Sequence, residues 1–537
     1  MSVFKLPPKG KVAVLGSGIS GLTFSYFLSK LRPDIKIAIL EQKPRAGGYI
    51  KSDKLQGDAL NENIIFEKGP RTLRGVSYGS LLIIDILKSL NCIDQIEAIS
   101  KNSVSNRKFL LGQDKDLIEV PHSFKSFVEF IKSGILSGIP KAIVRESFNR
   151  TKLKANEDES IESFFERHFK TKVLNDRVLS AIIHGIYAGD TSKLSIRSIF
   201  PRLVNMEKEN GSIIAYMIKK LFQKKAPAAP LPQSLIDYER YISKEADLDG
   251  LIKKLSNYPM IRLREGLESL VTALSGYIAK QENIDVKYDT NISEIDIASG
   301  TIKIKGSDPI TFDHVRSTIN SNSLAQMIPN DAKEVKDLLH LHYVSIFLCN
   351  IYSEGHLIPK NKNGFGFLVP KSVHNPESLL GVIFDSDIEQ NSVPLFDGPK
   401  YAKEMNYSKV TLMLGGHYYD DLGKIPSSSM NLEIVEKILN NILHFNTEKH
   451  NLIIRNEALD NEPLVSLKAN DLLISYTFID DCIPQFNVGY DEQKRKLLKV
   501  LDEASRGRFS IGGTSFGNGV GVPDCVLNSL EAALKMK

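Results

Sequence analysis

The sequence is poor in cysteine and lacks any long apolar run. Its four cysteines lie far apart, without a C-x-x-C pair or a histidine at metal-ligand spacing: Cys92, Cys349, Cys482 and Cys525. This spacing excludes a disulfide framework, so we expect four reduced, buried thiols. No segment reaches the roughly 18 apolar residues that a membrane-spanning helix needs. The opening stretch MSVFKLPPKG is too short and too broken for a secretory signal or an obvious presequence.

A strong excess of charge of one sign is also missing. The chain has 69 Lys or Arg and 64 Asp or Glu residues, and a net charge of +5 gives no indication of nucleic acid as a partner. No repeat with a period of about 20–50 residues is visible. What the sequence does have is 537 residues, 42% hydrophobic and 25% charged, as in soluble globular proteins. This length predicts two or three domains.

A glycine-rich turn near the start of the chain has the spacing of a dinucleotide-binding site. Residues 11–15 read as a short apolar strand, GSGISG follows in the G-x-G-x-x-G pattern, and 19–31 has helical character. The first glycine permits a tight turn, the second lets a pyrophosphate approach, and the third lets helix pack on strand. The helix N-terminus offers free N–H groups to the phosphates. Glu41, twenty residues past Gly21, is placed to accept hydrogen bonds from a ribose hydroxyl.

Two further glycine segments favour FAD over NAD. Arg45, Gly47 and Gly48 form an R-x-G-G signature after Glu41, where a second close backbone approach suits a longer, extended cofactor. Near the other end, residues 509–511 read as a strand, followed by GGTSFGNGVGVPDC and a helix from 524 to 536. These glycines admit a flat ring against the backbone, and the helix N-terminus directs positive potential toward it. The alternative for each segment is a glycine-rich loop that binds no ligand.

Five longer segments carry a family resemblance. They are FEKGPRTLRG (66–75), AIIHGIYAGDTSKLSIRSIFPRL (181–203), GFGFLVPKS (364–372), LLGVIFDS (379–386) and CIPQFNVGY (482–490). In sequence and order they resemble the oxygen-dependent, mitochondrial protoporphyrinogen oxidases of the amine oxidase and phytoene desaturase superfamily. The resemblance implies an FAD-dependent oxidoreductase that converts protoporphyrinogen IX to protoporphyrin IX in haem biosynthesis, with dioxygen as acceptor and hydrogen peroxide as product. The flavin carries such chemistry, and the protein orients the reactants.

The resemblance also implies which residues hold the cofactor and the substrate. The FAD-binding residues would be Gly16, Ser17, Gly18, Ile19, Ser20, Gly21, Glu41, Arg45, Gly48, Tyr49, Gly69, Pro70, Arg71, Thr72, Ile292, Thr514, Val520, Gly521 and Val522. The substrate is an apolar disc with two propionate arms, which needs a wide apolar site with a cation at its edge. Its residues would be Arg107, holding a propionate, and Phe365, Gly366, Leu368 and Met413. No metal is expected.

Several of these residues have a structural alternative. Phe365 could be a strand core residue, Met413 core filling, and Arg107 a solvated loop cation. Arg71 is better suited to supporting the loop around the flavin than to touching substrate. One position departs from the family, because His184 stands where many relatives have an arginine. Histidine titrates near neutrality and arginine does not, so we leave His184 out of the predicted site.

The basic segment 121–154 predicts a membrane contact. It holds seven Lys or Arg and two acids, the whole net charge, with apolar residues at helical spacing from Phe124 to Ile135. Two short amphipathic helices of this kind suit in-plane membrane binding, or else an ordinary helical pair with a solvated face. The resemblance favours the first and implies a peripheral protein on the intermembrane-space side of the mitochondrial inner membrane. A second copy of the chain and ferrochelatase are candidate partners.

The expected fold class is α/β, with a Rossmann-type FAD-binding domain, a β-rich substrate domain and a helical membrane-associating insertion. The predicted bounds are 1–96, 255–330 and 482–537 for the FAD-binding domain, 97–254 for the helical domain, and 331–481 for the substrate domain. The proline-rich stretch 224–233 is expected to be a mobile loop.

Two other functions are compatible with this fold. The first is an amine oxidase or carotenoid-type desaturase, although Cys525 lies at a helix start, the wrong context for a covalent flavin cysteine. The second is a non-catalytic binding protein like the dissociation inhibitors, which would lack the cofactor glycines that this chain keeps at both ends.

Overall fold

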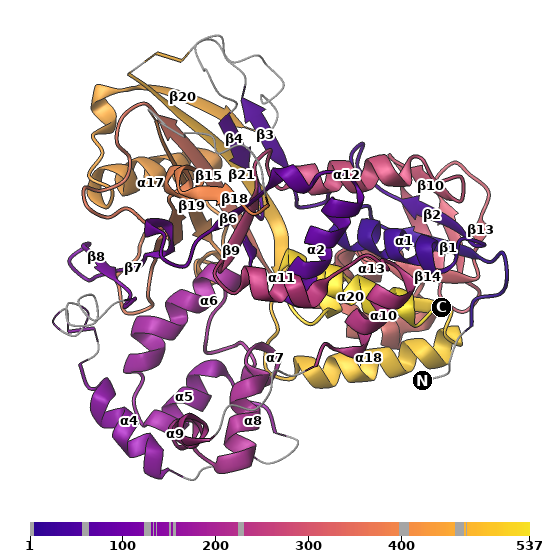
Figure 1. Ribbon diagram of the computed structural model, residues 1–537, viewed down its shortest axis with the longest axis horizontal. Coiled ribbons are helices and arrows are strands. Elements are labelled where there is room, and N and C mark those ends of the chain that lie inside the picture. The colour runs from indigo at the N-terminus through magenta and orange to yellow at the C-terminus, as the bar shows by residue number, and fades with distance from the viewer. Residues whose placement is uncertain are drawn as a thin grey trace.

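The computed structural model describes residues 5–55, 64–122, 130, 132, 134–135, 137–149, 152–153, 157–223, 230–396, 407–456, 467–468 and 470–537. They form an α/β lobe, a sheet-rich lobe and a helical lobe (Figure 1), which confirms the predicted fold class. Phe124, Phe127, Val128 and Ile131 of the predicted apolar stripe, and 224–229 of the proline-rich stretch, lie outside the described residues. Across the described ranges, no helix combines the length and hydrophobicity needed to cross a membrane.

A five-stranded parallel sheet forms the centre of the α/β lobe. Its strands, in spatial order, are β10 (Ile284–Lys287), β2 (Lys36–Leu40), β1 (Lys11–Leu15), β14 (His314–Ser317) and β22 (Phe509–Ile511). β1 and β22 have the bounds predicted from the sequence. Side chains of β1 alternate between two cores, Val12 and Val14 on one side and Ala13 and Leu15 on the other. After the exposed Lys11 at its start, the strand is therefore apolar, as expected when helices cover both faces.

The helices on one face of this sheet come from distant parts of the chain (Figure 1). They are α1 (Ile19–Leu31), α2 (Tyr78–Ser89), α12 (Glu268–Ile278) and α20 (Val522–Leu534), and their apolar side chains share one core. α1 and α20 lie side by side, and Ser529 Oγ donates to Ser20 O over 2.9 Å. The other face carries α13 (Ser321–Met327), α14 (Lys333–Leu339) and α18 (Tyr490–Ser505).

An eight-stranded mixed sheet builds the second lobe. Its strands, in spatial order, are β20 (Asn451–Asn456), β21 (Asp471–Pro484), β15 (Tyr343–Ser353), β19 (Ser408–Gly415), β17 (Leu379–Ile383), β16 (Gly366–Leu368), β7 (Lys108–Leu111) and β8 (Leu117–Glu119). One face packs on α17 (Ser428–Asn441) through Phe347, Cys349 and Leu412. The other face carries Leu368 and Met413 of the predicted substrate-binding residues, whereas the Arg107 guanidinium lies 5.6 Å from the ring of Phe109, which belongs to the core on the α17 side.

Three smaller sheets and a group of helices complete the fold. The sheets are β18 (Ser392–Pro394), β6 (Ile96–Ile99), β9 (Met260–Leu263) and β5 (Leu73–Arg74); β11 (Ile292–Asp296), β12 (Thr301–Ile304) and β13 (Ile310–Thr311); and β3 (Ser52–Leu55) with β4 (Ile64–Glu67). The helical lobe contains α4 (Ile139–Phe148), α5 (Ile161–Phe169), α6 (Ser180–Tyr187), α8 (Pro201–Asn210) and α9 (Ile213–Phe222), with the short α7 (Ile196–Ile199) leading into it. Three short helices each follow directly after a strand: α15 (Asp385–Gln390) after β17, α16 (His417–Asp421) after β19, and α19 (Gly513–Phe516) after β22.

The two ends of the predicted helical domain lie in the other lobes. β7 pairs with β16 in the eight-stranded sheet, and β8 follows it at the edge. α10 (Gln233–Tyr241) and α11 (Leu248–Leu255) bury Leu235, Tyr238 and Leu248 in the core beside α1 and α2. The helical lobe is thus shorter than the predicted range 97–254. The sequence did not indicate this, because strands of three or four residues and amphipathic helices do not reveal which core they join.

All four cysteines are free, in agreement with the absence of a disulfide framework. Cys349 and Cys525 are buried as expected, and Cys92 and Cys482 are only half-buried. Burial raises the pKa of the Cys349 thiol to about 12, which keeps it protonated and unreactive at neutral pH.

Candidate flavin and substrate site

Two glycine turns meet at the carboxyl end of β14. Gly16 has a φ of +91°, and a Cβ there would lie 2.9 Å from Ile319 Cγ2. Gly513 has a φ of +74°, and a Cβ there would lie 2.9 Å from Thr318 O. Thr318 Oγ1 donates to Leu15 O over 2.7 Å. One residue therefore touches the turns from both ends of the chain, at the sheet edge where dinucleotides bind in such folds.

Gly16 and Gly21, at the two ends of the first turn, have no room for a side chain. A Cβ on Gly21 would lie 2.0 Å from Gly16 O, so only glycine lets the helix pack on the turn. Gly18 precedes α1 as its N-cap, and a Cβ on Gly48 would lie 3.3 Å from Gly18 Cα. Ser17, Ile19 and Ser20 fill the remaining positions of this first turn and are buried. The tight turn predicted at Gly16 and the close helix packing predicted at Gly21 agree with these contacts, and the approach of a diphosphate at Gly18 stays a prediction.

Glu41 lies against the same turn at the end of β2. Its Oε2 accepts hydrogen bonds from Ser17 N over 2.8 Å and Ser17 Oγ over 2.9 Å, and its Oε1 accepts from Lys43 N. The acid is 9% exposed. A carboxylate has about four acceptor positions, so one remains for a ribose hydroxyl.

The R-x-G-G loop is held together by its own arginine. Arg45 donates to the carbonyl oxygens of Ala46, Gly48 and Ile50 over 2.8–3.1 Å. Tyr49 is 43% exposed, and its hydroxyl donates to Asp481 O over 3.3 Å. Arg45 therefore shapes the loop, and Tyr49 presents a flat aromatic surface between the α/β and sheet-rich lobes.

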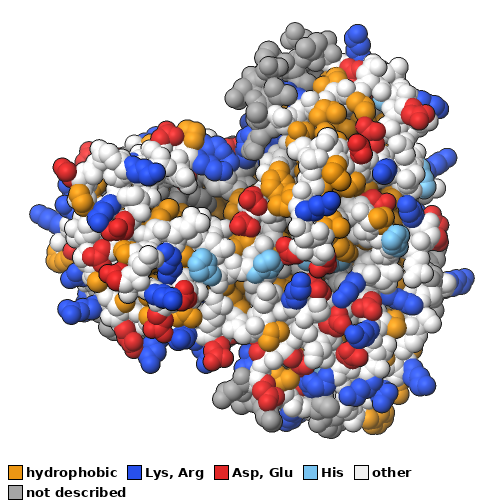
Figure 2. Space-filling model, turned by 180° about the vertical axis from the view of Figure 1, so that it is seen from behind, with side chains coloured by type: hydrophobic (Ala, Val, Ile, Leu, Met, Phe, Trp, Pro, Cys, Tyr) orange, Lys and Arg blue, Asp and Glu red, His pale blue; other side chains and the backbone are white. Residues whose placement is uncertain are grey.

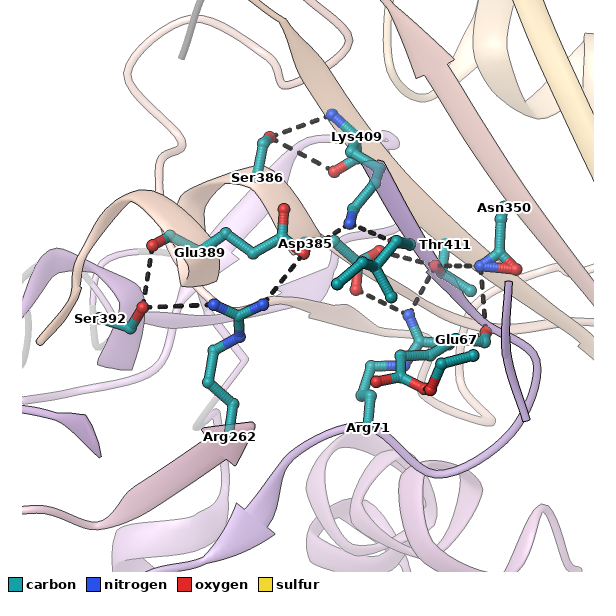
Figure 3. Close-up of polar contacts among 12 residues, drawn as sticks. Glu67, Arg71, Arg262, Asn350, Asp385, Ser386, Glu389, Ser392, Lys409 and Thr411 are labelled. Carbon is teal, nitrogen blue, oxygen red and sulfur yellow. Dashed lines mark hydrogen bonds and ion pairs between the residues drawn. The ribbon is translucent and has the colours of Figure 1, made fainter. Parts of the chain in front are cut away.

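Arg71 ties the loop after β4 to the sheet-rich lobe (Figure 3). Its Nη1 donates to Asp385 Oδ1 over 2.7 Å and to Thr411 Oγ1. Thr411 in turn donates to Asp385 Oδ2, and Asn350 Nδ2 donates to Glu67 O over 3.1 Å. Burial raises the pKa of Glu67. The Arg71 guanidinium is thus hydrogen-bonded to residues of the sheet-rich lobe, in agreement with the interpretation that Arg71 supports this loop.

The loop held by Arg71 also contains the other predicted residues of this segment. A Cβ on Gly69 would lie 2.1 Å from Tyr49 O, so the loop packs directly on the R-x-G-G segment. Pro70 and Thr72 are half-buried beside it. The R-x-G-G segment and the loop 69–72 therefore form one surface.

The remaining predicted cofactor residues lie in other segments of the α/β lobe. Thr514 follows Gly513 in α19. Val520 and Ile292 are half-buried against the same core. Gly521 is the N-cap of α20 and Val522 its first residue. Thr514 therefore lies at the converged edge, and Ile292 lies at the start of β11.

Three of the predicted substrate residues, Gly366, Leu368 and Met413, share one face of the eight-stranded sheet. Leu368, Gly381 and Met413 are direct partners on β16, β17 and β19, so they point to the same side. Thr411, two residues from Met413, lies on that side too and contacts Arg71. Gly381 has no side chain and lies between Leu368 and Met413. The Leu368 side chain partly fills the space above it, because a Cβ on Gly381 would lie 2.8 Å from Leu368 Cδ2.

Gly366 and Phe365 lie at the end of this row, beside Arg107. Gly366 has a φ of +134°, and a Cβ there would lie 2.0 Å from Val382 O. Phe365 is half-buried, and its N–H donates to Arg107 O over 2.7 Å. Three positions that the resemblance implies from two separate motifs are therefore neighbours in space.

The Arg107 side chain is held by a carboxylate. Its Nε donates to Glu119 Oε1 over 2.8 Å and its Nη2 to Glu119 Oε2 over 2.7 Å. The guanidinium also lies 5.6 Å from the centre of the Phe109 ring. This arrangement lowers the pKa of Glu119. Arg107 is therefore a fixed cation at the sheet edge rather than a solvated loop residue.

His184, which the sequence analysis set aside, lies next to the substrate face. Its Nδ1 donates to Val369 O over 2.7 Å, and its Nε2 lies 3.0 Å from Nε2 of His417. Burial lowers the pKa of His184 to about 4. Leu368 packs against Gly185, the next residue along α6. Asp385, Thr411 and His417 were not predicted, because only the folded sheet brings them together.

Comparison with known proteins places these features in a family. A family model for flavin-containing amine oxidoreductases matches residues 19–534. The chain belongs to this family. Flavin-containing amine oxidoreductases use FAD, and the chain is accordingly an FAD-dependent oxidoreductase. The prediction of the enzyme class and of its cofactor is confirmed.

Curated members of the family resemble the chain over its whole length. A protoporphyrinogen oxidase of Saccharomyces cerevisiae is 35% identical, covering 99% of this chain and 98% of that protein. The Schizosaccharomyces pombe protoporphyrinogen oxidase is 30% identical, with 98% of both covered. The resemblance recognised from the motifs is thereby confirmed. A crystallised candidate protoporphyrinogen oxidase from Exiguobacterium sp. 255-15 has the same fold, with a TM-score of 0.67, 17% identity and 98% of both chains covered.

The residues at the converged edge fit FAD. Gly48 has a φ of +60°, and a Cβ there would lie 3.3 Å from Gly18 Cα, so the two glycines bring the R-x-G-G loop against the start of α1, where a helix N-terminus suits a diphosphate. Figure 2 shows, from behind, a notch between the α/β lobe and the sheet-rich lobe.

Proposed function

We propose that the chain oxidises protoporphyrinogen IX to protoporphyrin IX, passing the electrons to dioxygen and forming hydrogen peroxide, as a step of haem biosynthesis. One observation carries the proposal: glycine turns from both chain ends converge beside an apolar sheet face in a chain with full-length protoporphyrinogen oxidase relatives. FAD supplies the two-electron acceptor, and the six hydrogens that the substrate loses require three rounds. The protein binds, orients and shields the reactants.

The cofactor would extend along the converged edge. Glu41 would hold the ribose and the start of α1 the diphosphate, with Gly48 and Tyr49 following toward the flavin. The loop 69–72 and the segment from Thr514 to Val522 would border the ring system. This assignment is supported by the contacts that bring the three segments together. Ile292 would lie at the adenine end, as the family resemblance implies.

The tetrapyrrole would lie against the row formed by Leu368, Gly381 and Met413. The missing side chain at Gly381 leaves a shallow apolar surface suited to a flat ring. Phe365 and Gly366 would border it. Arg107 would hold a propionate, since its planar fork already binds the Glu119 carboxylate in the same bidentate way. A substrate propionate would share or displace that partner.

The helical lobe would bind a membrane surface. α4 and α9 pack together, and α4 exposes Val144 and Phe148 beside Lys141 and Arg145. α9 exposes Leu221 and Phe222, 82% and 87% accessible, after Lys219 and Lys220. Exposed apolar side chains flanked by cations suit an anionic interface.

The family resemblance supports a place for that interface in the cell. We propose the intermembrane-space side of the mitochondrial inner membrane. A second copy of the chain and ferrochelatase are the proteins that we propose as partners there. The apolar substrate and product favour a site that opens near lipid.

An aerobic assay tests the proposed reaction. Purified, flavin-loaded protein should raise protoporphyrin fluorescence from protoporphyrinogen IX, with stoichiometric peroxide, well above autoxidation in protein-free buffer. Coproporphyrinogen III should be offered in parallel, because a Bacillus subtilis coproporphyrinogen III oxidase is 23% identical to the chain. A flavin-loaded protein that oxidises only coproporphyrinogen, or only amines, would overturn the substrate assignment.

A further inference from the structure

Arg316 on β14 is a buried cation without an acidic partner among the described residues. It is 5% exposed and pairs in register with Val14 of β1 and Ser510 of β22. Its Nη1 donates to Ile511 O over 2.6 Å and its Nη2 to Asn528 Oδ1 over 3.1 Å. Its Nε has no hydrogen-bond partner. Only neutral acceptors therefore face this guanidinium.

Two other arginines in the interior, Arg262 and Arg71, are neutralised by carboxylates. Arg262 pairs with Glu97 over 2.6 Å and Glu389 over 3.5 Å, and Arg71 pairs with Asp385 (Figure 3). Burying a charge without a counter-charge is unfavourable even when hydrogen bonds remain. Burial accordingly lowers the pKa of Arg316 to about 10. The fold retains a charge that nothing in the described chain offsets.

The position of Arg316 indicates what could offset its charge. A Cβ on Gly512 would lie 2.1 Å from Arg316 Nη2, so the guanidinium lies directly against the turn after β22. The next residue, Gly513, packs on Thr318, which also contacts Gly16. The guanidinium lies 5.6 Å from the centre of the Phe24 ring on α1. Arg316 is therefore beneath the edge where both glycine turns and the start of α1 meet.

We propose that Arg316 is a buried counter-charge for the diphosphate of FAD. The inference rests on FAD as the family's cofactor and on the diphosphate lying at the start of α1. The negative diphosphate would offset the buried cation, and the cation would add to the positive end of the α1 dipole. The consequence is that the charge disfavours the flavin-free fold and favours the flavin-bound one.

Three substitutions separate charge from hydrogen bonding. Arg316→Met removes both, Arg316→Gln keeps a donor without charge, and Arg316→Lys keeps the charge. Full-length protein freed of flavin is titrated with FAD, and its thermal unfolding is measured without FAD. We expect Arg316→Met and Arg316→Gln to raise the FAD Kd about tenfold or more, equivalent to about 1.4 kcal/mol. Their flavin-free Tm should be unchanged or raised, and Arg316→Lys should keep the Kd within about threefold.

Arg262→Met is the matched control. It removes one of the two arginines that pair with the buried carboxylate of Glu97 and should therefore lower the flavin-free Tm. ADP, which has the diphosphate but no isoalloxazine, should lose affinity for Arg316→Gln by the same factor as FAD. The reduction potential of the bound flavin should stay near the wild-type value.

Several results would overturn the proposal. One is an FAD Kd within twofold of wild type in Arg316→Gln. Another is a shifted flavin potential with unchanged ADP binding, which would assign the charge to the isoalloxazine. A third is a flavin-free Tm that falls in both Arg316→Met and Arg316→Gln, or failure of both to fold, which would make Arg316 a structural residue. Wild-type protein that does not bind FAD would instead refute the cofactor.

Discussion

At the scale of single residues, the glycines of the first turn carry the strictest requirement. Gly16 combines a left-handed φ of +91° with only 2.9 Å between a Cβ and Ile319. A β-branched side chain there meets both a backbone and a packing penalty. The requirement concerns the turn itself, so its loss should affect the cofactor before it affects the sheet-rich lobe.

We predict that Gly16→Val yields colourless protein of reduced stability. The turn would have to open by several tenths of an ångström, which removes the close approach for the diphosphate. Flavin absorbance per mole of purified protein measures the effect. Gly276→Ala is the control, because a Cβ there meets nothing within 4 Å inside α12, and it should keep full flavin content. Equal flavin content in both variants would contradict the assigned turn.

The pair formed by Arg107 and Glu119 is a second test at this scale. Arg107→Ala should raise the KM for protoporphyrinogen about tenfold or more with normal flavin content, since a charged hydrogen bond contributes roughly 1.5–3 kcal/mol. Glu119→Gln should leave KM unchanged or lower it, because the amide releases the guanidinium for substrate. Steady-state kinetics distinguishes the two. A KM for Arg107→Ala within twofold of wild type would remove Arg107 from the substrate site.

At the scale of elements, the local motifs of the nucleotide site could be predicted and the lobe boundaries could not. β1, α1 and β22 begin and end where the sequence indicated, because glycines and apolar runs mark them. β7 and β8 are only four and three residues long and were grouped with the helices that follow them. The contact between Arg71 and Thr411 joins residues that are 340 positions apart. No local pattern encodes such a pairing.

The helices α4 and α9 are a further case of partial prediction. The sequence indicated a basic amphipathic region at 121–154, which includes α4, but it did not indicate α9. The structure places the two together and exposes apolar side chains on both. Membrane contact is therefore argued from a pair of elements rather than from the basic segment alone.

We predict that Leu221→Asp combined with Phe222→Asp weakens binding to anionic vesicles at least about tenfold. Each exposed side chain can bury an apolar area worth roughly 1.5–3 kcal/mol, and the added acids oppose anionic lipid. Co-sedimentation with vesicles rich in an anionic phospholipid measures it. Leu422→Asp, at an exposed leucine of the sheet-rich lobe, should bind like wild type. Unchanged sedimentation of the double variant would place the membrane contact elsewhere.

At the scale of the whole molecule, the site depends on convergence of distant segments. The start of the chain, its end and the strand β14 supply one edge, and the eight-stranded sheet supplies the facing surface. Ionic and hydrogen-bonded contacts such as Arg71–Asp385 join the two lobes. The same burial that orders these lobes also depresses the basicity of histidines inside them.

Acidification should therefore destabilise the protein through buried histidines. His314 donates from Nδ1 to Gly507 O over 3.1 Å, and its Nε2 lies 2.8 Å from Ser510 Oγ. Burial and Arg316 lower the pKa of His314 to about 3, and burial lowers the pKa of His184 to about 4. An unfolded histidine titrates near 6.5, so between these values the unfolded chain binds more protons than the folded one.

The free energy of unfolding should therefore rise with pH from about 3–4 up to about 6.5 and fall as the pH is lowered through that window. Between pH 6.5 and 5, each buried histidine should cost up to about 2 kcal/mol, at 1.36 kcal/mol per pKa unit. We predict that His314→Asn and His184→Asn each flatten the decline of unfolding free energy over this range, measured by urea denaturation. His374→Asn, at an exposed histidine, should keep the wild-type slope. If all three variants decline in parallel with wild type, the buried histidines do not set the acid limit, and paired carboxylates must.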